Sequence, residues 1–152
     1  PDFAGDATPA ELRDVVNLTE RVKRAVIYTS MKGAMKFMAT MQEEQEFLEY
    51  AADQIITAFA IDSVVARALA AARAGAADAH THALLAQVAT INLVRQARAA
   101  MEGALTMTFD GEERKAELAR VRAYLGDPEA DIVPLQRELA GIISEANSYP
   151  LK

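Results

Sequence analysis

Apolar residues recur at three- and four-residue steps along most of this 152-residue chain, in five segments separated by glycine, proline and short polar stretches. This spacing places the apolar side chains on one side of an α-helix, whereas a strand would need strict alternation. Alanine, the best helix former, supplies much of the 51% hydrophobic fraction. We therefore expect an all-α protein, an up-and-down helical bundle with long antiparallel hairpins.

Residues that favour helix ends mark the boundaries of about five helices. Thr8 followed by Pro9 is typical of a helix start, and Gly75 of the left-handed residue after a helix end. Asp110 and Asp131 are the expected N-caps of two shorter helices. The predicted helices cover residues 9–40, 43–74, 78–108, 111–125 and 132–147.

The three longer helices are expected to form the main packing unit and the two shorter ones a lid across it. The chain then divides into a linker at 1–8, a three-helix core at 9–109, and two helices with a terminal tail at 110–152 that complete the same domain. In the second helix we expect Phe47, Ile55, Phe59 and Val65 to face inward, among others. In the third helix, Ala99 is expected to face inward.

Composition excludes several classes of function. The net charge of -6 disfavours a nucleic-acid partner. The chain has no cysteine, so disulfides and thiolate metal sites are excluded, and a reducing, cytoplasmic location is expected. No apolar run is expected to approach the ~20 residues of a membrane span. Since the chain begins with Pro1, it was either processed or is a piece of a larger polypeptide.

Catalytic motifs are missing from the sequence. His80 and His82 would point to different sides of a helix, and no Glu-x-x-His pair completes a metal site. Neither a nucleophile elbow nor a glycine-rich phosphate loop occurs. We assign no catalytic, cofactor-binding or metal-binding residue.

The first helix has no acidic residue between Glu20 and Glu43 but carries several basic ones. They form either a solvated face, a face that pairs with an acidic neighbour, or a face that docks on a membrane with nearby methionines dipping toward the acyl chains. These basic residues are Arg21, Lys23, Arg24, Lys32 and Lys36.

One carboxylate interrupts the apolar line of the second helix, and one guanidinium interrupts that of the third. We hypothesise that Asp62 and Arg95 form a buried or half-buried ion pair across the hairpin. The alternative is that Asp62 lies at a domain boundary and meets solvent or another subunit.

The second helix resembles a segment in the C-terminal extension of large acyl-CoA dehydrogenases, the very-long-chain type and its bacterial relatives. The third helix is similar in its run VRQARAAMEG at 94–103, and the tail at 148–151 resembles the family's short terminal tail. The matching pairs in the second helix are Glu44-Gln45, Phe47-Leu48, Ala52-Asp53, Phe59-Ala60 and Arg67-Ala68.

The resemblance implies an auxiliary domain of an enzyme that uses FAD to desaturate fatty acyl-CoA thioesters in β-oxidation. The flavin and the catalytic glutamate would lie in a preceding core, so this fragment would hold no cofactor. The partner of this domain would be the catalytic core of the same polypeptide, in an enzyme that forms a homodimer. The domain would cover the core, contribute to dimer contacts and dock on the inner face of the membrane. The rival interpretation is a free-standing interaction module that binds a partner helix along Thr29, Ser30 and Gly33. An enzyme in its own right is disfavoured.

Overall fold

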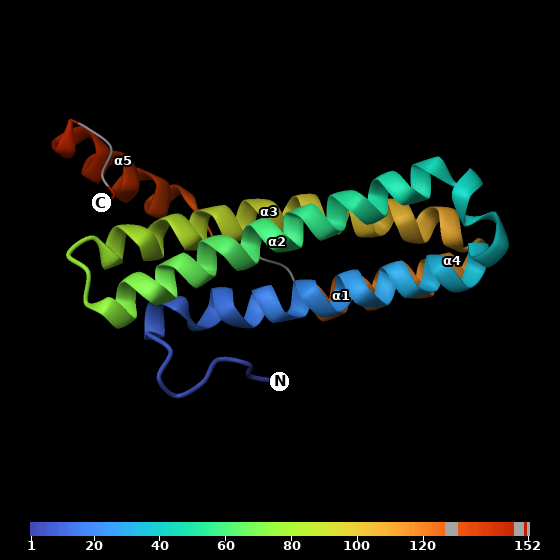
Figure 1. Cartoon of the computed structure of the whole chain (residues 1–152), viewed down its shortest axis with the longest axis horizontal. Helices are drawn as coiled ribbons and strands as arrows, with labels where there is room; N and C mark the ends of the chain where they lie inside the picture. Colours follow the sequence, from blue (N-terminus) through green and yellow to red (C-terminus); the bar gives the residue numbers. More distant parts are fainter. Residues whose placement is uncertain (127–130, 148–150, 152) are drawn as a thin grey trace.

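The computed structural model describes residues 1–126, 131–147 and 151, and in these residues it confirms the expected all-α fold (Figure 1). The second to fifth helices begin and end within two residues of their predicted bounds. The first differs, because short 3-10 segments precede and follow it. The elements are η1 (Ala10–Leu12), α1 (Arg13–Phe37), η2 (Met38–Glu43), α2 (Gln45–Ala74), α3 (Ala79–Thr108), α4 (Gly111–Leu125) and α5 (Val133–Ala146).

The three long helices lie side by side, each antiparallel to the next along the chain (Figure 1). Gly75 makes the tight turn from α2 into α3: it has φ 62° and ψ 34°, the left-handed conformation that glycine adopts most readily. Its amide and that of Ala76 donate hydrogen bonds to the last carbonyls of α2. This turn explains why α2 and α3 form the most extensive contact in the molecule.

The two shorter helices do not form one lid. The helix α4 packs against both α1 and α3 and completes a four-helix bundle, whereas among the described elements α5 contacts α3 alone. In Figure 1, α5 lies at the opposite end of the molecule from α4. The apolar residues of α5 are therefore only half-buried, as at Leu135 and Leu139. The tail residues 148–150, which carried part of the family resemblance, lie outside the described residues.

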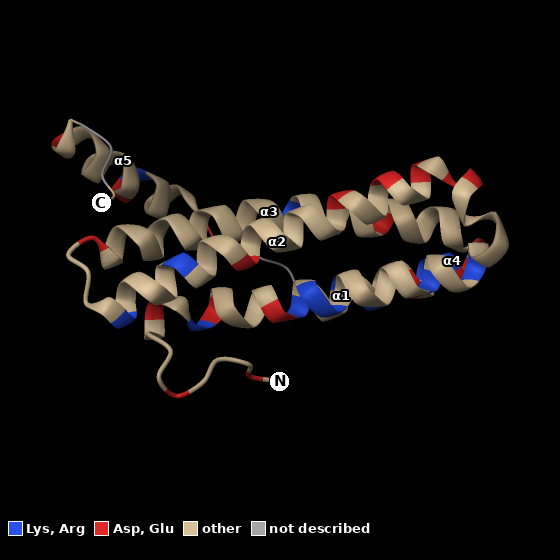
Figure 2. Cartoon of the chain, viewed as in Figure 1, with Lys and Arg blue, Asp and Glu red and all other residues tan. Residues whose placement is uncertain are grey.

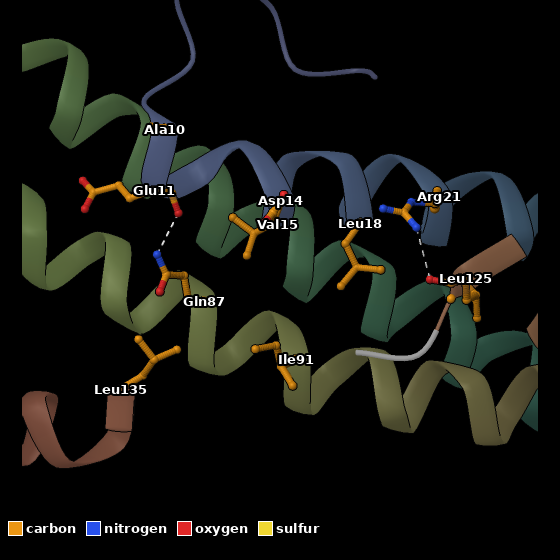
Figure 3. A pocket seen from close by; sticks show the side chains of 11 residues that line it. Ala10, Glu11, Asp14, Val15, Leu18, Arg21, Gln87, Ile91, Leu125 and Leu135 are labelled. Atoms are coloured by element: carbon orange, nitrogen blue, oxygen red, sulfur yellow. Dashed lines mark hydrogen bonds between the residues drawn. The ribbon is translucent and has the colours of Figure 1, made fainter. Parts of the chain in front are cut away.

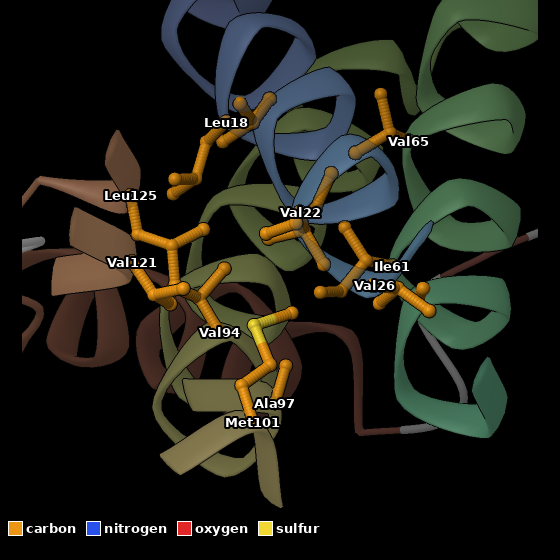
Figure 4. Close-up of a cluster of buried hydrophobic side chains, with 14 of the residues drawn as sticks. Leu18, Val22, Val26, Ile61, Val65, Val94, Ala97, Met101, Val121 and Leu125 are labelled. Atoms are coloured by element: carbon orange, nitrogen blue, oxygen red, sulfur yellow. The ribbon is translucent and has the colours of Figure 1, made fainter. Parts of the chain in front are cut away.

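The core is aliphatic and draws on α1, α2, α3 and α4 (Figure 4). Val22, Ile61 and Met101 have no exposed surface, and Leu125 brings the end of α4 against them. Burial of each such side chain contributes about 1.5–3 kcal/mol to folding. This shared core holds α4 in place.

Two predicted inward positions of α2, Ile55 and Phe59, are instead exposed, and so is Ala99 of α3. The reason is that α2 is apolar on nearly every side, so its periodicity does not select a buried face. The expectation that no segment approaches a membrane span was also wrong. Among the described helices, α2 has the length and composition to cross a bilayer, with a mean hydropathy of 1.8 over a window that is 22% buried. A helix in a bundle core can meet the same criteria.

Candidate functional site

The surface of the bundle carries a set of exposed apolar side chains shared by α1 and α2. Met38 is 76% exposed, Phe59 74% and Met35 70%. Single exposed apolar residues are common on protein surfaces, but a group of them on neighbouring helices indicates a contact surface. We call this set the α1–α2 apolar face. Its members are Ile27, Met31, Met35, Met38, Ile55 and Phe59.

An ion pair at one edge shows that the two rows of side chains share a side of the bundle. Lys23 Nζ lies 3.0 Å from Asp62 Oδ1, which joins α1 to α2. Residues three, four or seven positions apart on a helix share a face. Ile27 therefore continues from Lys23 along α1, and Phe59 continues from Asp62 in the corresponding direction along α2, since the helices are antiparallel. Ile55 lies one turn further along α2.

Small and polar residues beneath this face let the two helices approach closely. The Phe47 ring fills the space where a Gly33 side chain would lie, and Thr29 donates a hydrogen bond to Gln54 Oε1. Both Thr29 and Gln54 are fully buried. The small stripe that we considered as a groove for a partner helix is therefore occupied by α2 itself.

The centre of the face carries no charge. No acidic or basic residue occurs in α2 between Asp53 and Asp62, and Figure 2 shows the charged residues of α2 toward either side of this stretch. On α1, Lys32 follows Met31 but is directed toward α4, where its Nζ lies 3.4 Å from Glu117 Oε1, whereas Lys36 follows Met35 and is exposed. A methionine-rich surface with charge only at its borders suits contact with another apolar surface.

The five basic residues of the first helix do not gather into one patch. They point in several directions, and four of them are engaged within the chain. Lys36 is exposed. Arg21 donates to the Leu125 carbonyl, Lys23 pairs with Glu20 and Asp62, Arg24 lies 4.6 Å from the Phe3 ring centroid, and Lys32 pairs with Glu117.

The hypothesis of a buried Asp62–Arg95 pair was wrong. Both residues are exposed, and the carboxylate of Asp62 pairs with Lys23. The pattern misled because the apolar residues on either side of Asp62 were assumed to be buried. Since Phe59 is itself exposed, Asp62 lies beside a surface, at the edge of the α1–α2 apolar face.

The interface between α1 and α4 contains Glu117, the one carboxylate that is buried among the described residues. It accepts a hydrogen bond of 2.5 Å from the Tyr28 hydroxyl and one of 2.8 Å from Arg120. Burial alone would raise the pKa of Glu117, but the bond from Tyr28 and the charges of Lys32 and Arg120 outweigh it and lower the pKa. Sequence reasoning missed this cluster, because its members are far apart in the chain.

His80 joins three elements near the other end of the bundle. Its Nε2 lies 2.7 Å from Glu138 Oε1 of α5, and its Nδ1 lies 3.4 Å from Glu11 Oε2 of η1. The hydrogen bond with Glu138, followed by that with Glu11, raises the pKa of His80 despite some desolvation. The protonated ring therefore ties α5 to the bundle.

A groove of about 490 Å³ runs between α1 and α3, bounded by Leu125 and Leu135 (Figure 3). Hydrogen bonds from Arg21 to Leu125 and from Gln87 to Glu11 cross it. Its lining combines scattered polar groups with apolar ones and aligns no nucleophile with a base. Nor does any cluster of three or more potential metal ligands occur in the described part of the chain.

Comparisons with known proteins point to one family. Residues 21–123 match the family model described as "Acyl-CoA dehydrogenase, C-terminal domain". A solved acyl-CoA dehydrogenase from Bacillus anthracis, complexed with FAD, superposes with a TM-score of 0.88 at 20% identity. That match covers 98% of this chain but only 26% of the solved chain, so the likeness shows a shared fold over about a quarter of the larger protein. A comparison with curated proteins found no match.

Proposed function

The chain belongs to the family of acyl-CoA dehydrogenase C-terminal domains, and we propose that it serves as the non-catalytic helical domain of a larger, FAD-dependent acyl-CoA dehydrogenase. The observation that carries this proposal is the family match across residues 21–123. The similar fold in the Bacillus anthracis enzyme supports it, because there the fold is one part of a chain about four times as long.

The groove between α1 and α3 does not fit a flavin. The diphosphate of FAD would need cationic or backbone N–H donors in an enclosed site. This groove has Glu11 and Asp14 along it, whose carboxylates would repel a diphosphate, and its Arg21 and Gln87 already donate to backbone carbonyls. We therefore assign FAD and the chemistry of acyl-CoA oxidation to the remainder of the enzyme.

The role proposed for this domain is structural. It covers part of the catalytic portion and contributes to the contacts of a homodimer that oxidises fatty acyl-CoA thioesters in β-oxidation. A cytoplasmic location, with contact to the inner membrane face, belongs to the same proposal. The exposed α1–α2 apolar face supports a covering role, since a surface of this kind is stabilised by burial against another protein.

The test compares the whole enzyme with a version that lacks these 152 residues. We expect the whole enzyme to hold one FAD per chain and to reduce an electron-accepting dye when given an acyl-CoA. The shortened version should lose solubility or change its mass by light scattering, whereas the 152-residue chain alone should hold no flavin. A flavin that co-purifies with this chain alone at one per chain, or dehydrogenation by it, would refute the proposal.

A further inference from the structure

The α1–α2 apolar face is uncovered in this chain, although α4 packs against a neighbouring side of α1. The Lys32 side chain of α1 is directed toward α4, where it meets Glu117. Met31, which precedes it, is exposed. The two directions differ because neighbouring residues on a helix are about 100° apart. Nothing within the described residues covers the methionine side.

The N-terminal segment shows from which side a preceding polypeptide would arrive. Phe3 lies against α1: its amide donates to Asn17 Oδ1 at 2.5 Å, and the Arg24 guanidinium lies 4.6 Å from its ring centroid. Figure 1 shows this segment running beside the first half of α1. Asn17, Arg24 and Met31 are spaced by seven residues, so they share one side of α1. The segment and the apolar face therefore lie on the same side of the helix.

We propose that the α1–α2 apolar face is the surface that packs against the catalytic portion of the same acyl-CoA dehydrogenase polypeptide. This inference rests on the proposed function. In the similar solved enzyme, about three-quarters of the chain lies outside this fold, which leaves ample protein to cover the face. In a C-terminal domain that portion precedes Pro1, and the segment leading from it reaches α1 on the side where Met31 and Met35 are exposed.

The chemistry of the face favours a protein occupant over an anionic membrane. Lys23, at its edge, is neutralised by Asp62 and Glu20, and Lys32 is held by Glu117 on another side. An interfacial helix would need free basic residues flanking the apolar row. The methionine and isoleucine side chains that make up the face instead match the core of a permanent interface between domains.

Methionine oxidation tests the proposal directly. Dilute hydrogen peroxide is applied to the 152-residue chain alone and to the uninterrupted polypeptide that includes its upstream sequence, and each sulfoxide is followed by mass spectrometry. We expect Met31, Met35 and Met38 to oxidise at least ~10-fold more slowly in the longer polypeptide, because burial restricts access to the sulfur. Met101, which is fully buried here, serves as the slow reference in both.

A pair of variants adds a second measurement. In the longer polypeptide, Met31→Asp with Phe59→Asp should return the oxidation rate of Met35 to that of the free chain. The matched control Ile143→Asp, on the exposed side of α5, should leave it slow. In the free chain, both variants should melt within ~2 °C of the parent, since surface substitutions rarely unfold a protein. If the double variant fails to fold, the methionine oxidation rates of the unsubstituted free chain and longer polypeptide still test the proposal.

Three results would overturn the inference. Equal methionine oxidation rates in the two polypeptides would show that the face is uncovered in the enzyme. Protection that rises with concentration of the free chain would identify a second copy as the occupant, and protection only with phosphatidylglycerol vesicles would identify a membrane. An upstream sequence that binds no flavin would instead refute the proposed function itself, which flavin absorbance distinguishes from these results.

Discussion

Gly33 offers the sharpest test of how α1 and α2 pack. A Cβ atom added to Gly33 would lie 1.9 Å from Phe47 Cζ and 2.0 Å from Cε2. Carbon atoms in contact normally lie about 3.5–4.0 Å apart, so the ring or the helix would have to move by about 1.5 Å. The ring has little freedom, because Phe47 is only 2% exposed and packs against Phe37 with ring centroids 5.2 Å apart.

Two effects of Gly33→Ala oppose each other. Alanine favours a helix interior by about 1 kcal/mol over glycine. Overpacking a well-filled core costs about 1–3 kcal/mol, and so deep an overlap places the cost at the upper end. The free energy of unfolding should therefore fall by about 2 kcal/mol, which corresponds to a melting temperature lower by about 4–8 °C.

Urea denaturation followed by circular dichroism at 222 nm measures this loss. Gly141→Ala is the matched control: Gly141 lies in α5, and a Cβ there meets nothing within 4 Å, so no loss is expected. In a Phe47→Leu background, Gly33→Ala should cost at least ~1 kcal/mol less, because the shorter side chain removes most of the overlap. The reasoning would be refuted if the Gly33→Ala protein were as stable as the parent. It would also be refuted if Gly33→Ala lowered the free energy of unfolding equally in the parent and in the Phe47→Leu background.

Three further predictions concern polar groups. Because the pKa of His80 is raised by Glu138, protonation stabilises the docking of α5 below about pH 6.5, and this stabilisation is lost as the pH rises through the folded pKa. Amide exchange in α5, corrected for intrinsic rates, should therefore be slower at pH 6 than at pH 8, and His80→Ala should abolish the difference. Glu117→Gln should lower the free energy of unfolding at pH 7 by about 1–3 kcal/mol, because the half-buried Tyr28 hydroxyl loses a charged acceptor. The lowered pKa of Glu117 means that this deficit should shrink below about pH 4, as the parent's carboxylate protonates, and a pH-independent deficit would contradict the assignment. Gln54→Met should change the free energy of unfolding by less than about 1 kcal/mol, because the buried Nε2 of Gln54 has no partner to lose and the Thr29 hydroxyl, which loses Oε1, keeps the Ala25 carbonyl 3.0 Å away as an acceptor; a loss above about 2 kcal/mol in urea denaturation would contradict this.

The ends of the helices were predictable because they depend on local chemistry. Gly75 is in the left-handed conformation at the end of α2, as expected for glycine at that position. Asp131 was predicted as the N-cap of α5 but lies one residue before it: the N-cap is Ile132, and Asp131 accepts a hydrogen bond from the Val133 amide. Asp110 differs: its carboxylate pairs with the Arg114 side chain, and the structure shows no side-chain cap there.

The candidate surface was not predictable in the same way. The buried side of α1 was recognised, as at Val22, because polar residues separate its apolar positions. In α2, Ile55, Phe59 and Ile61 are equally apolar, and only Ile61 is buried. Nothing local distinguishes them, because the difference depends on where α1 and α3 lie.

The amino-acid pattern by itself determined that this chain is helical, where its helices end, and which family it resembles, since propensity, capping and apolar spacing act over a few residues. Tertiary structure alone decided which side of α2 is left open, that Asp62 meets Lys23, and that Glu117 is buried against Tyr28. Those outcomes require segments tens of residues apart to meet. Their pairing minimises the free energy of the whole bundle, which no local pattern encodes.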